Sequence, residues 1–294
     1  MTRPVERLRY AAPADRPRHA GPGGAKLIVW PVVNVENWLI DNPMPRQVLV
    51  APTGAALQPD LPNWAWHEYG MRVGFWRFHA LFERLRIRPT LSVNGSVIGA
   101  YPRVVAAARD AGWEFMGHGW FQVPTHRVED QRAMIAQTAE AIRTFTSKPC
   151  TGWLGPGLTE TLETPDLLAE AGIRWTGDFV VDDLPARIAT AHGTMLAMPY
   201  SVELNDIPVV MIQHHDEREL PRRARLQAAR LLQEAEAGAG CKVMCIAIHP
   251  YITGVPHRIA ALESLCADLA GDPRIAFLQG DNIADWYLAS GDAA

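Results

Sequence analysis

The sequence predicts an α/β fold, one barrel-like domain, because short apolar segments alternate along the chain with longer amphipathic ones. Length and composition agree with this fold. The chain has 294 residues, of which 48% are hydrophobic and 20% charged, and a single α/β barrel is common at this size. Polar residues follow several of the apolar segments, so we expect a site where parallel strands end. Residues 25–294 are expected to form the barrel domain.

The expected elements follow from the period of the apolar residues. The run at 26–33 is too short and too β-branched for a helix, so it predicts a buried strand. Residues 1–24 are rich in Pro, Arg, Ala and Gly and predict an irregular N-terminal arm. Repeated prolines predict a long loop over 41–72. Further strands are expected at 90–93, 113–116, 151–154, from 173, at 242–248 and at 275–278, with helices at 73–86, 101–111, 128–146, 164–171, 218–238, 256–270 and 281–289.

Charge and cysteine content exclude several classes of partner. The net charge is −4 with both signs interspersed, which argues against a nucleic-acid or membrane surface. The longest apolar runs are far shorter than the ~20 residues that span a bilayer. The N-terminus lacks the apolar region of a signal peptide, and the four cysteines are scattered, so they are interpreted as buried or free thiols. A cytoplasmic location is therefore expected.

Three polar side chains stand at the ends of predicted strands. Glu36 follows the first strand, His118 follows the strand at 113–116, and His249 follows the most apolar strand of the chain. Each alone could be a solvated loop charge or a structural histidine. A carboxylate and two histidines at neighbouring strand ends together favour a hydrolase site, because these groups can activate water and protonate a leaving group.

Five segments in order resemble the polysaccharide deacetylase (NodB homology) superfamily. The resemblance covers roughly residues 26–289 and looks closest to the branch that holds allantoinases and cyclic imidases. It implies a distorted (β/α)7 barrel that commonly forms homo-oligomers. The segments that carry it are 69–77, 112–120, 182–185, 198–201 with 205–206, and 249–250.

The resemblance also implies a metal site that is altered here. The deacetylases carry two aspartates in the first motif and two histidines, four residues apart, in the second. Asn34 stands at the first aspartate and Glu36 at the second, whereas a reading with adjacent aspartates makes Glu36 the base and Asn37 the ligand. His118 matches the first histidine and Gln122 the second.

A metal at this site would have Glu36, His118 and Gln122 as its ligands. This set is poor for zinc, which prefers Cys, His and carboxylate ligands, and His126 replaces Gln122 only if its loop folds back. An asparagine cannot act as a general base near neutral pH. We therefore expect either no cofactor or a weakly bound divalent metal such as zinc.

The altered motif favours hydrolysis of a carbon–nitrogen bond in a small cyclic amide, a ureide or an imide. Glu36 would be the base, His118 would orient water or bind metal, and His249 would be the general acid. Asp183 would orient His249 or contact the substrate, and backbone N–H groups of the 153–157 turn would face it. The residues expected to contact the substrate are Asn34, Trp66, Trp120, Gln122, Trp153 and Gly155.

Two other functions remain open from the sequence. A metal-dependent carbohydrate or peptidoglycan N-deacetylase would need an open groove and a bound divalent ion. A catalytically weakened homologue that only binds a ligand is favoured by Asn34 and Gln122. In all three cases the expected partners are a small molecule and further copies of the chain. The arm at 1–24 and the tryptophans of the 41–72 loop are the expected contacts between copies.

Overall fold

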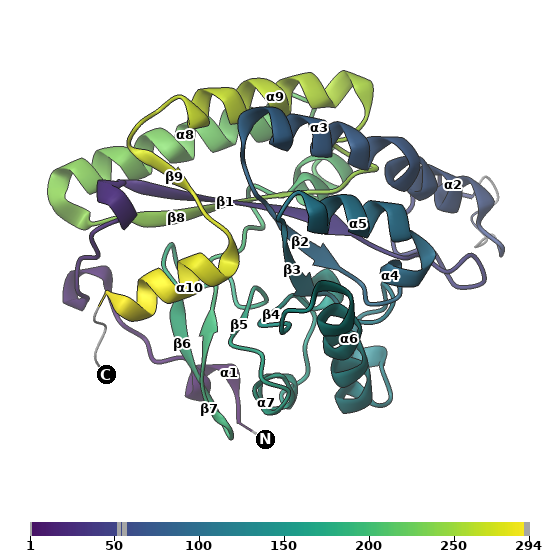
Figure 1. Cartoon of the computed structure of the whole chain (residues 1–294), viewed down its shortest axis with the longest axis horizontal. Helices are drawn as coiled ribbons and strands as arrows, with labels where there is room; N and C mark the ends of the chain where they lie inside the picture. Colours follow the sequence, from purple (N-terminus) through teal and green to yellow (C-terminus); the bar gives the residue numbers. More distant parts are fainter. Residues whose placement is uncertain (1, 52–53, 55–57, 291–294) are drawn as a thin grey trace.

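The structure is a computed structural model that describes residues 2–51, 54 and 58–290; the parts of the predicted 41–72 loop at 52–53 and 55–57 lie outside them. Parallel strands form a barrel, with helices on its outside (Figure 1). The strands are β1 Leu27–Val35, β2 Thr90–Val93, β3 Glu114–Gly117, β4 Gly152–Trp153, β5 Trp175–Thr176, β6 Ala186–Thr190, β7 Gly193–Ala197, β8 Lys242–Ile248 and β9 Ile275–Phe277.

The strand order explains why the barrel is distorted. Neighbouring strands follow the order β6-β7-β5-β4-β3-β2-β1-β8, and β9 pairs with the first residues of β1. Between β7 and β8 the barrel is closed by little more than a parallel bridge from Asn205 to Ala247 and a hydrogen bond from the Val243 N–H to the Asp183 carbonyl. The predicted α/β barrel in a single domain is confirmed.

Helices pack around the strands. α8, α9 and α3 lie side by side along β1 and β8, and α10 lies across the amino ends of β2 and β3 (Figure 1). The helices are α1 Pro4–Arg7, α2 Leu61–Tyr69, α3 Phe75–Leu85, α4 Val97–Ala100, α5 Pro102–Asp110, α6 Gln131–Thr146, α7 Thr164–Glu170, α8 Glu219–Glu234, α9 Pro256–Ala270 and α10 Gly280–Ala289.

The alternation of β1 separates two hydrophobic cores. Ile28, Trp30 and Val32 belong to the core inside the barrel, whereas Leu27 and Val29 belong to the core between strands and helices. Successive strand residues point to opposite faces. The inward row therefore continues beyond Val32 into polar residues at the carboxyl end of the strand, where the candidate site begins.

The predicted loop at 41–72 is wrong over its second half. Leu61–Tyr69 form α2, and a wider π-type turn over Gly70–Gly74 joins α2 to α3. The Asp60 side chain accepts a hydrogen bond from the Asn63 N–H and so caps the helix, and Pro62 is tolerated because the first turn needs no N–H partner. Prolines that were interpreted as loop residues therefore mark a helix start.

The region between β5 and β8 contains a hairpin that the sequence did not predict. β6 and β7 pair antiparallel from Ala186–Ala197 to Thr190–Gly193, and β7 then continues the parallel sheet beside β5. The hairpin strands are half exposed at their tips. Their mixed burial gives no clear two-residue period, which explains why the pattern was missed.

The N-terminal arm packs along its own barrel, which corrects the expectation that it buries little there. Arg7 is buried, and its guanidinium forms an ion pair with Asp166. Leu8 bridges Ile188 of β6, and the buried His19 accepts a backbone hydrogen bond from Cys241 at its carbonyl. The arm contains the short helix α1 and two 3-10 turns, and it is part of the folded domain.

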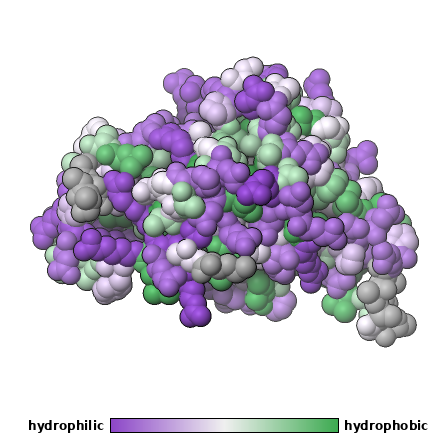
Figure 2. Space-filling view, turned by 90° about the horizontal axis from the view of Figure 1, so that it is seen from below, coloured by the Kyte–Doolittle hydropathy of each residue, from purple (hydrophilic) through white to green (hydrophobic). Residues whose placement is uncertain are grey.

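The surface carries no extended apolar area on the face shown in Figure 2, where hydrophobic residues lie in small groups among hydrophilic ones. Within the part of the chain that is described, no helix is long and apolar enough to cross a membrane.

Candidate active site

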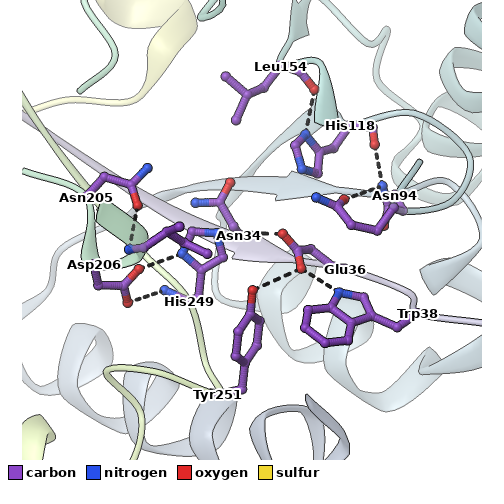
Figure 3. A network of polar contacts seen from close by, with 12 residues as sticks. Asn34, Glu36, Trp38, Asn94, His118, Leu154, Asn205, Asp206, His249 and Tyr251 are labelled. Carbon is purple, nitrogen blue, oxygen red and sulfur yellow. Dashed lines mark hydrogen bonds and ion pairs between the residues drawn. The ribbon is translucent and has the colours of Figure 1, made fainter. Parts of the chain in front are cut away.

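Three strand ends bring Glu36, His118 and His249 together (Figure 3). The residues follow β1, β3 and β8, whose carboxyl ends meet at one end of the barrel. Only 2%, 3% and 5% of the three residues, respectively, is exposed. The three residues expected at strand ends therefore lie in one cluster, and the tertiary structure encloses that cluster almost completely.

Glu36 is held as a carboxylate by its neighbours. Its Oε2 accepts hydrogen bonds from the Trp38 indole at 2.6 Å and the Tyr251 hydroxyl at 3.2 Å, and its Oε1 lies 3.6 Å from His249 Nε2. Burial raises the pKa of Glu36, but this is opposed mainly by the nearby charges of His249 and Arg46, and the net pKa is lowered. Glu36 can therefore accept a proton at neutral pH.

His249 is oriented by Asp206, not by Asp183. Its Nδ1 lies 2.6 Å from Asp206 Oδ1, and its backbone N–H and the Thr253 hydroxyl donate to Asp206 Oδ2 at 2.8 and 2.6 Å. This contact places a proton on Nδ1 and turns Nε2 toward Glu36. The expectation for Asp183 is wrong: it is exposed, and its carbonyl bonds to Val243 near the opposite end of β8. The signal for Asp206 was present in the 205–206 segment of the resemblance.

His118 is neutral and fixed in one tautomer. Its Nδ1 lies 2.5 Å from the Leu154 carbonyl, which can only accept, so Nδ1 carries the proton and Nε2 is free to accept. Burial lowers the pKa of His118 to about 4, against an opposing effect of the Glu36 charge. At neutral pH this histidine can position a donor such as water.

Amide side chains complete the cluster. Asn34 Nδ2 donates to the Tyr200 hydroxyl at 3.1 Å, which leaves its second amide hydrogen available. Asn94 donates to the His118 carbonyl and to Gln122 Oε1, the latter at 3.3 Å. Asn94 was not predicted; it continues the inward row of β2 beyond Ser92, and this alternation could have identified it.

The side chains present do not make a good metal site. In the chain as described, no group of three or more His, Cys, Asp or Glu residues is placed to hold a metal ion. Gln122 is engaged with Asn94, and Glu36 Oε2 is engaged with Trp38 and Tyr251. His126 is exposed on a 3-10 turn and does not replace Gln122. No catalytic step is therefore assigned to a metal, and weak zinc binding stays a prediction.

The turn after β4 supports His118, and two of its N–H groups are already bonded within the protein. Trp153 is fully buried in the core between strands and helices, because it is the outward residue of β4, so its expected substrate contact is wrong. The Gly155 N–H donates to both oxygens of Asp178, at 2.8 and 2.9 Å, and is not free for a substrate. The Leu154 N–H donates to the Gly117 carbonyl.

Trp120 also points away from the cluster. Its ring packs against Gly95, in the space that a side chain at that position would need. It also lines an outer groove with Ile98 and Phe145. Trp66 lies nearer the site. Its ring centroid is 4.8 Å from that of Tyr251 and 6.2 Å from that of Trp38. Trp66 therefore supports the two residues that hydrogen-bond to Glu36.

Two glycines let the α2–α3 junction support the site. A Cβ on Gly70 would lie 2.5 Å from the Tyr251 backbone nitrogen, and one on Gly74 would lie 2.1 Å from the Pro250 carbonyl oxygen. Both distances are far too short for a side chain. The helices can therefore press directly on the segment that follows His249, which fixes Tyr251 over Glu36.

A buried Glu–His pair with an Asp-oriented histidine, at the carboxyl ends of barrel strands, defines a hydrolase-type site. Residues 67–176 match the polysaccharide deacetylase family. The chain is 25% identical over 240 residues to a Schizosaccharomyces pombe protein named "Putative polysaccharide deacetylase". The alignment covers 76% of this chain and 75% of that protein. The chain is therefore similar to the polysaccharide deacetylase family, a family of hydrolases of carbon–nitrogen bonds.

Two solved structures have the same fold over nearly the whole chain. A probable polysaccharide deacetylase from Pseudomonas aeruginosa PAO1 has a TM-score of 0.84 and 22% identity, covering 95% of this chain and 97% of that one. PuuE allantoinase has a TM-score of 0.84 and 21% identity, covering 96% of both chains. At this identity the likeness establishes the fold alone.

Proposed function

We propose that this protein hydrolyses a carbon–nitrogen bond in a small cyclic amide, a ureide or an imide. The observation that carries the proposal is the pairing of Glu36 with His249. Their side chains face each other across 3.6 Å, and Asp206 holds the far nitrogen of the imidazole. A base and an acid that face one reaction centre are what amide hydrolysis requires.

In the proposed reaction Glu36 takes a proton from water, and the water oxygen attacks the amide carbonyl carbon. Glu36 passes this proton to His249 Nε2, which faces it across 3.6 Å. The imidazolium so formed gives the proton to the nitrogen as the carbon–nitrogen bond breaks, and both residues return to their starting states. The Asp206 carboxylate stabilises the imidazolium before this transfer. Neutral His118, with Nε2 free to accept, orients the attacking water.

Asn34 is assigned to the negative charge that forms on the carbonyl oxygen. Only one of its amide hydrogens is used, on Tyr200, and Figure 3 shows Asn34 in the same cluster as Glu36 and His249. A preorganised amide donor in a site that excludes water stabilises such an oxyanion. The asparagine that cannot be a base therefore has a role as a donor.

Burial of the cluster favours a small substrate over a polymer. Glu36 is 2% exposed and covered by Trp38 and Tyr251, whereas a polysaccharide needs an open groove. The likeness in fold to an allantoinase is consistent with a cyclic amide as substrate. A carbohydrate N-deacetylase remains the alternative suggested by the family.

A weakened, ligand-binding homologue is the second candidate. It is favoured by Asn34, an amide at the position where the resemblance places a base, and by Gln122, which is engaged with Asn94. Such a protein would bind a cyclic amide without turning it over.

Turnover of a substrate panel separates these functions. The panel contains allantoin, succinimide and N-acetyl sugars, measured with the wild type and with Glu36→Gln, alongside elemental analysis of the purified protein. Hydrolysis of a cyclic amide that is lost in the variant supports the proposal. Release of acetate with stoichiometric zinc indicates the deacetylase, and binding without turnover indicates the weakened homologue.

A further inference from the structure

A cavity of about 430 Å³ lies next to the buried cluster. The segment 37–46 forms one side of it, 121–127 another, and 156–159 closes the third. Trp38 and Gln122 belong both to this cavity and to the cluster, since Trp38 donates to Glu36 and Gln122 accepts from Asn94. A substrate whose amide reaches Glu36 would place its remaining atoms here.

The charge of this cavity is entirely positive. Two arginines, Arg46 and Arg127, line it, and no Asp, Glu or His does. Among the residues that the structure describes, neither guanidinium has an ion-pair partner within 4.0 Å, and the Nε of Arg46 is buried without a hydrogen bond. The polar groups that complete the lining are amides and a threonine.

Two other enclosed arginines of this chain form ion pairs, and the half-buried Arg77 and Arg258 donate to hydroxyl or carbonyl oxygens. Arg7 is bound to Asp166 at 2.5 Å, and Arg16 is bound to Asp182. Holding a half-buried cation away from water without a partner is costly. Arg46 carries that cost at the mouth of the candidate site, which indicates that its partner arrives with the ligand.

The geometry points to a substrate that carries a carboxylate beside its scissile amide. Arg46 and Arg127 would bind that carboxylate, because the guanidinium fork matches its two oxygens. This inference rests on the proposed function for the chemistry at Glu36 and narrows its substrate class from any small cyclic amide to an anionic one.

A competing interpretation is that Arg46 acts only on Glu36, whose pKa it lowers. In that case replacing Arg46 would slow neutral and anionic substrates by the same factor. An arginine that binds the substrate instead changes the preference between the two. The ratio of the two rates, not either rate alone, therefore decides the question.

The experiment uses matched pairs of cyclic amides that differ by a carboxylate: dihydrouracil with dihydroorotate, and hydantoin with hydantoin-5-acetate. The preference is kcat/KM for the anion divided by kcat/KM for the neutral compound. We expect the wild type to prefer the anion, and Arg46→Gln and Arg127→Gln each to lower the preference by about tenfold or more. Arg103→Gln, an exposed arginine of α5, is the control that leaves the preference unchanged.

Binding provides a readout that does not depend on turnover. Titration calorimetry of the same four compounds against the wild type and the arginine variants gives the same preference as a ratio of Kd values. If no compound is hydrolysed but the anions bind better through Arg46 and Arg127, the proposed function fails and this inference stands. A wild type that binds neutral and anionic compounds equally, or variants that keep the wild-type preference, would overturn it. Should Arg46→Gln fold poorly, Arg127→Gln at the exposed rim decides.

Discussion

The two ends of the barrel each hold a glutamate, and the two carboxyl groups have opposite properties. Glu36 lies at the carboxyl end of β1, where mainly the charges of His249 and Arg46 lower its pKa despite burial. Glu114 lies at the amino end of β3, where burial and then the Asp281 charge raise its pKa to about 7. The neighbours, rather than the residue type, decide which carboxyl group stays ionised.

Their hydrogen bonds differ in the same way. Glu114 accepts from the Gly280 and Asp281 N–H groups at 2.8 and 2.7 Å and from the Thr90 hydroxyl at 2.6 Å, so it fastens the start of α10 to the strands. Glu36 keeps one oxygen directed at His249. One end of the barrel is therefore built for attachment and the other for chemistry, in agreement with the usual division of α/β barrels.

The largest expected effect is a loss of catalysis at the carboxyl end of the barrel, with the fold left intact. Glu36→Gln should lower kcat/KM about 10²–10⁴-fold, because an amide cannot take the proton from water. The melting temperature should change little, since Gln keeps an acceptor for Trp38. Steady-state kinetics on the hydrolysed substrate test this, and a variant that retains more than about a tenth of wild-type activity, a loss under ~1.4 kcal/mol, would contradict the role.

A smaller effect is expected when the orienting carboxylate is removed. Asp206→Asn should lower kcat about a hundredfold, because an amide neither fixes the His249 tautomer nor stabilises the imidazolium. Asp183→Asn is the matched control, since Asp183 is exposed and lies near the opposite end of β8. Equal losses in the two variants would show that Asp206 has no special part in the reaction.

At the amino end of the barrel, Glu114 should affect the free energy of unfolding. Because the pKa of Glu114 rises from its ordinary value of 4.5 to about 7 on folding, the folded state binds its proton more tightly. Its contribution is complete below pH 4.5 and is lost as the pH rises toward 7. The loss is roughly 1–3 kcal/mol, after allowance for its partial exposure.

Glu114→Gln removes that titration, so the variant should lose less stability than the wild type between pH 5 and pH 8. Chemical denaturation at both values measures this. An unchanged pH dependence would mean that Glu114 ionises normally in the fold.

The smallest expected effect on either end of the barrel comes from assembly. We propose a dimer or tetramer with contacts near the 41–72 segment, where Val48, Leu49, Val50 and Leu61 are 46–76% exposed. Leu49→Asp should lower the mass measured by light scattering. Removal of residues 1–23 should also destabilise the barrel, because the ion pair of Arg7 is lost with it. A monomeric wild type would refute the assembly.

The sequence by itself determined the strand and helix order and the positions of Glu36, His118 and His249. Local periodicity carries that information, because a buried strand and the residue at its end are consecutive in the chain. The apolar runs at 90–93 and 242–248 match β2 and β8 residue for residue. Segments with mixed burial, such as α2 and the β6–β7 hairpin, carried too weak a period to be predicted.

Only the tertiary structure decided which partners those residues have. Asp183 and Asp206 are both aspartates in candidate segments, and it is the pairing of residue 205 with Ala247 that brings Asp206 to His249. Trp153 points outward because of the register of β4 with its neighbouring strands, and the sequence of β4 alone does not give that register. Arg46 and Arg127 meet in one cavity from distant segments. Electrostatics and packing act through space, so the chain order could supply the reactive residues but not their surroundings.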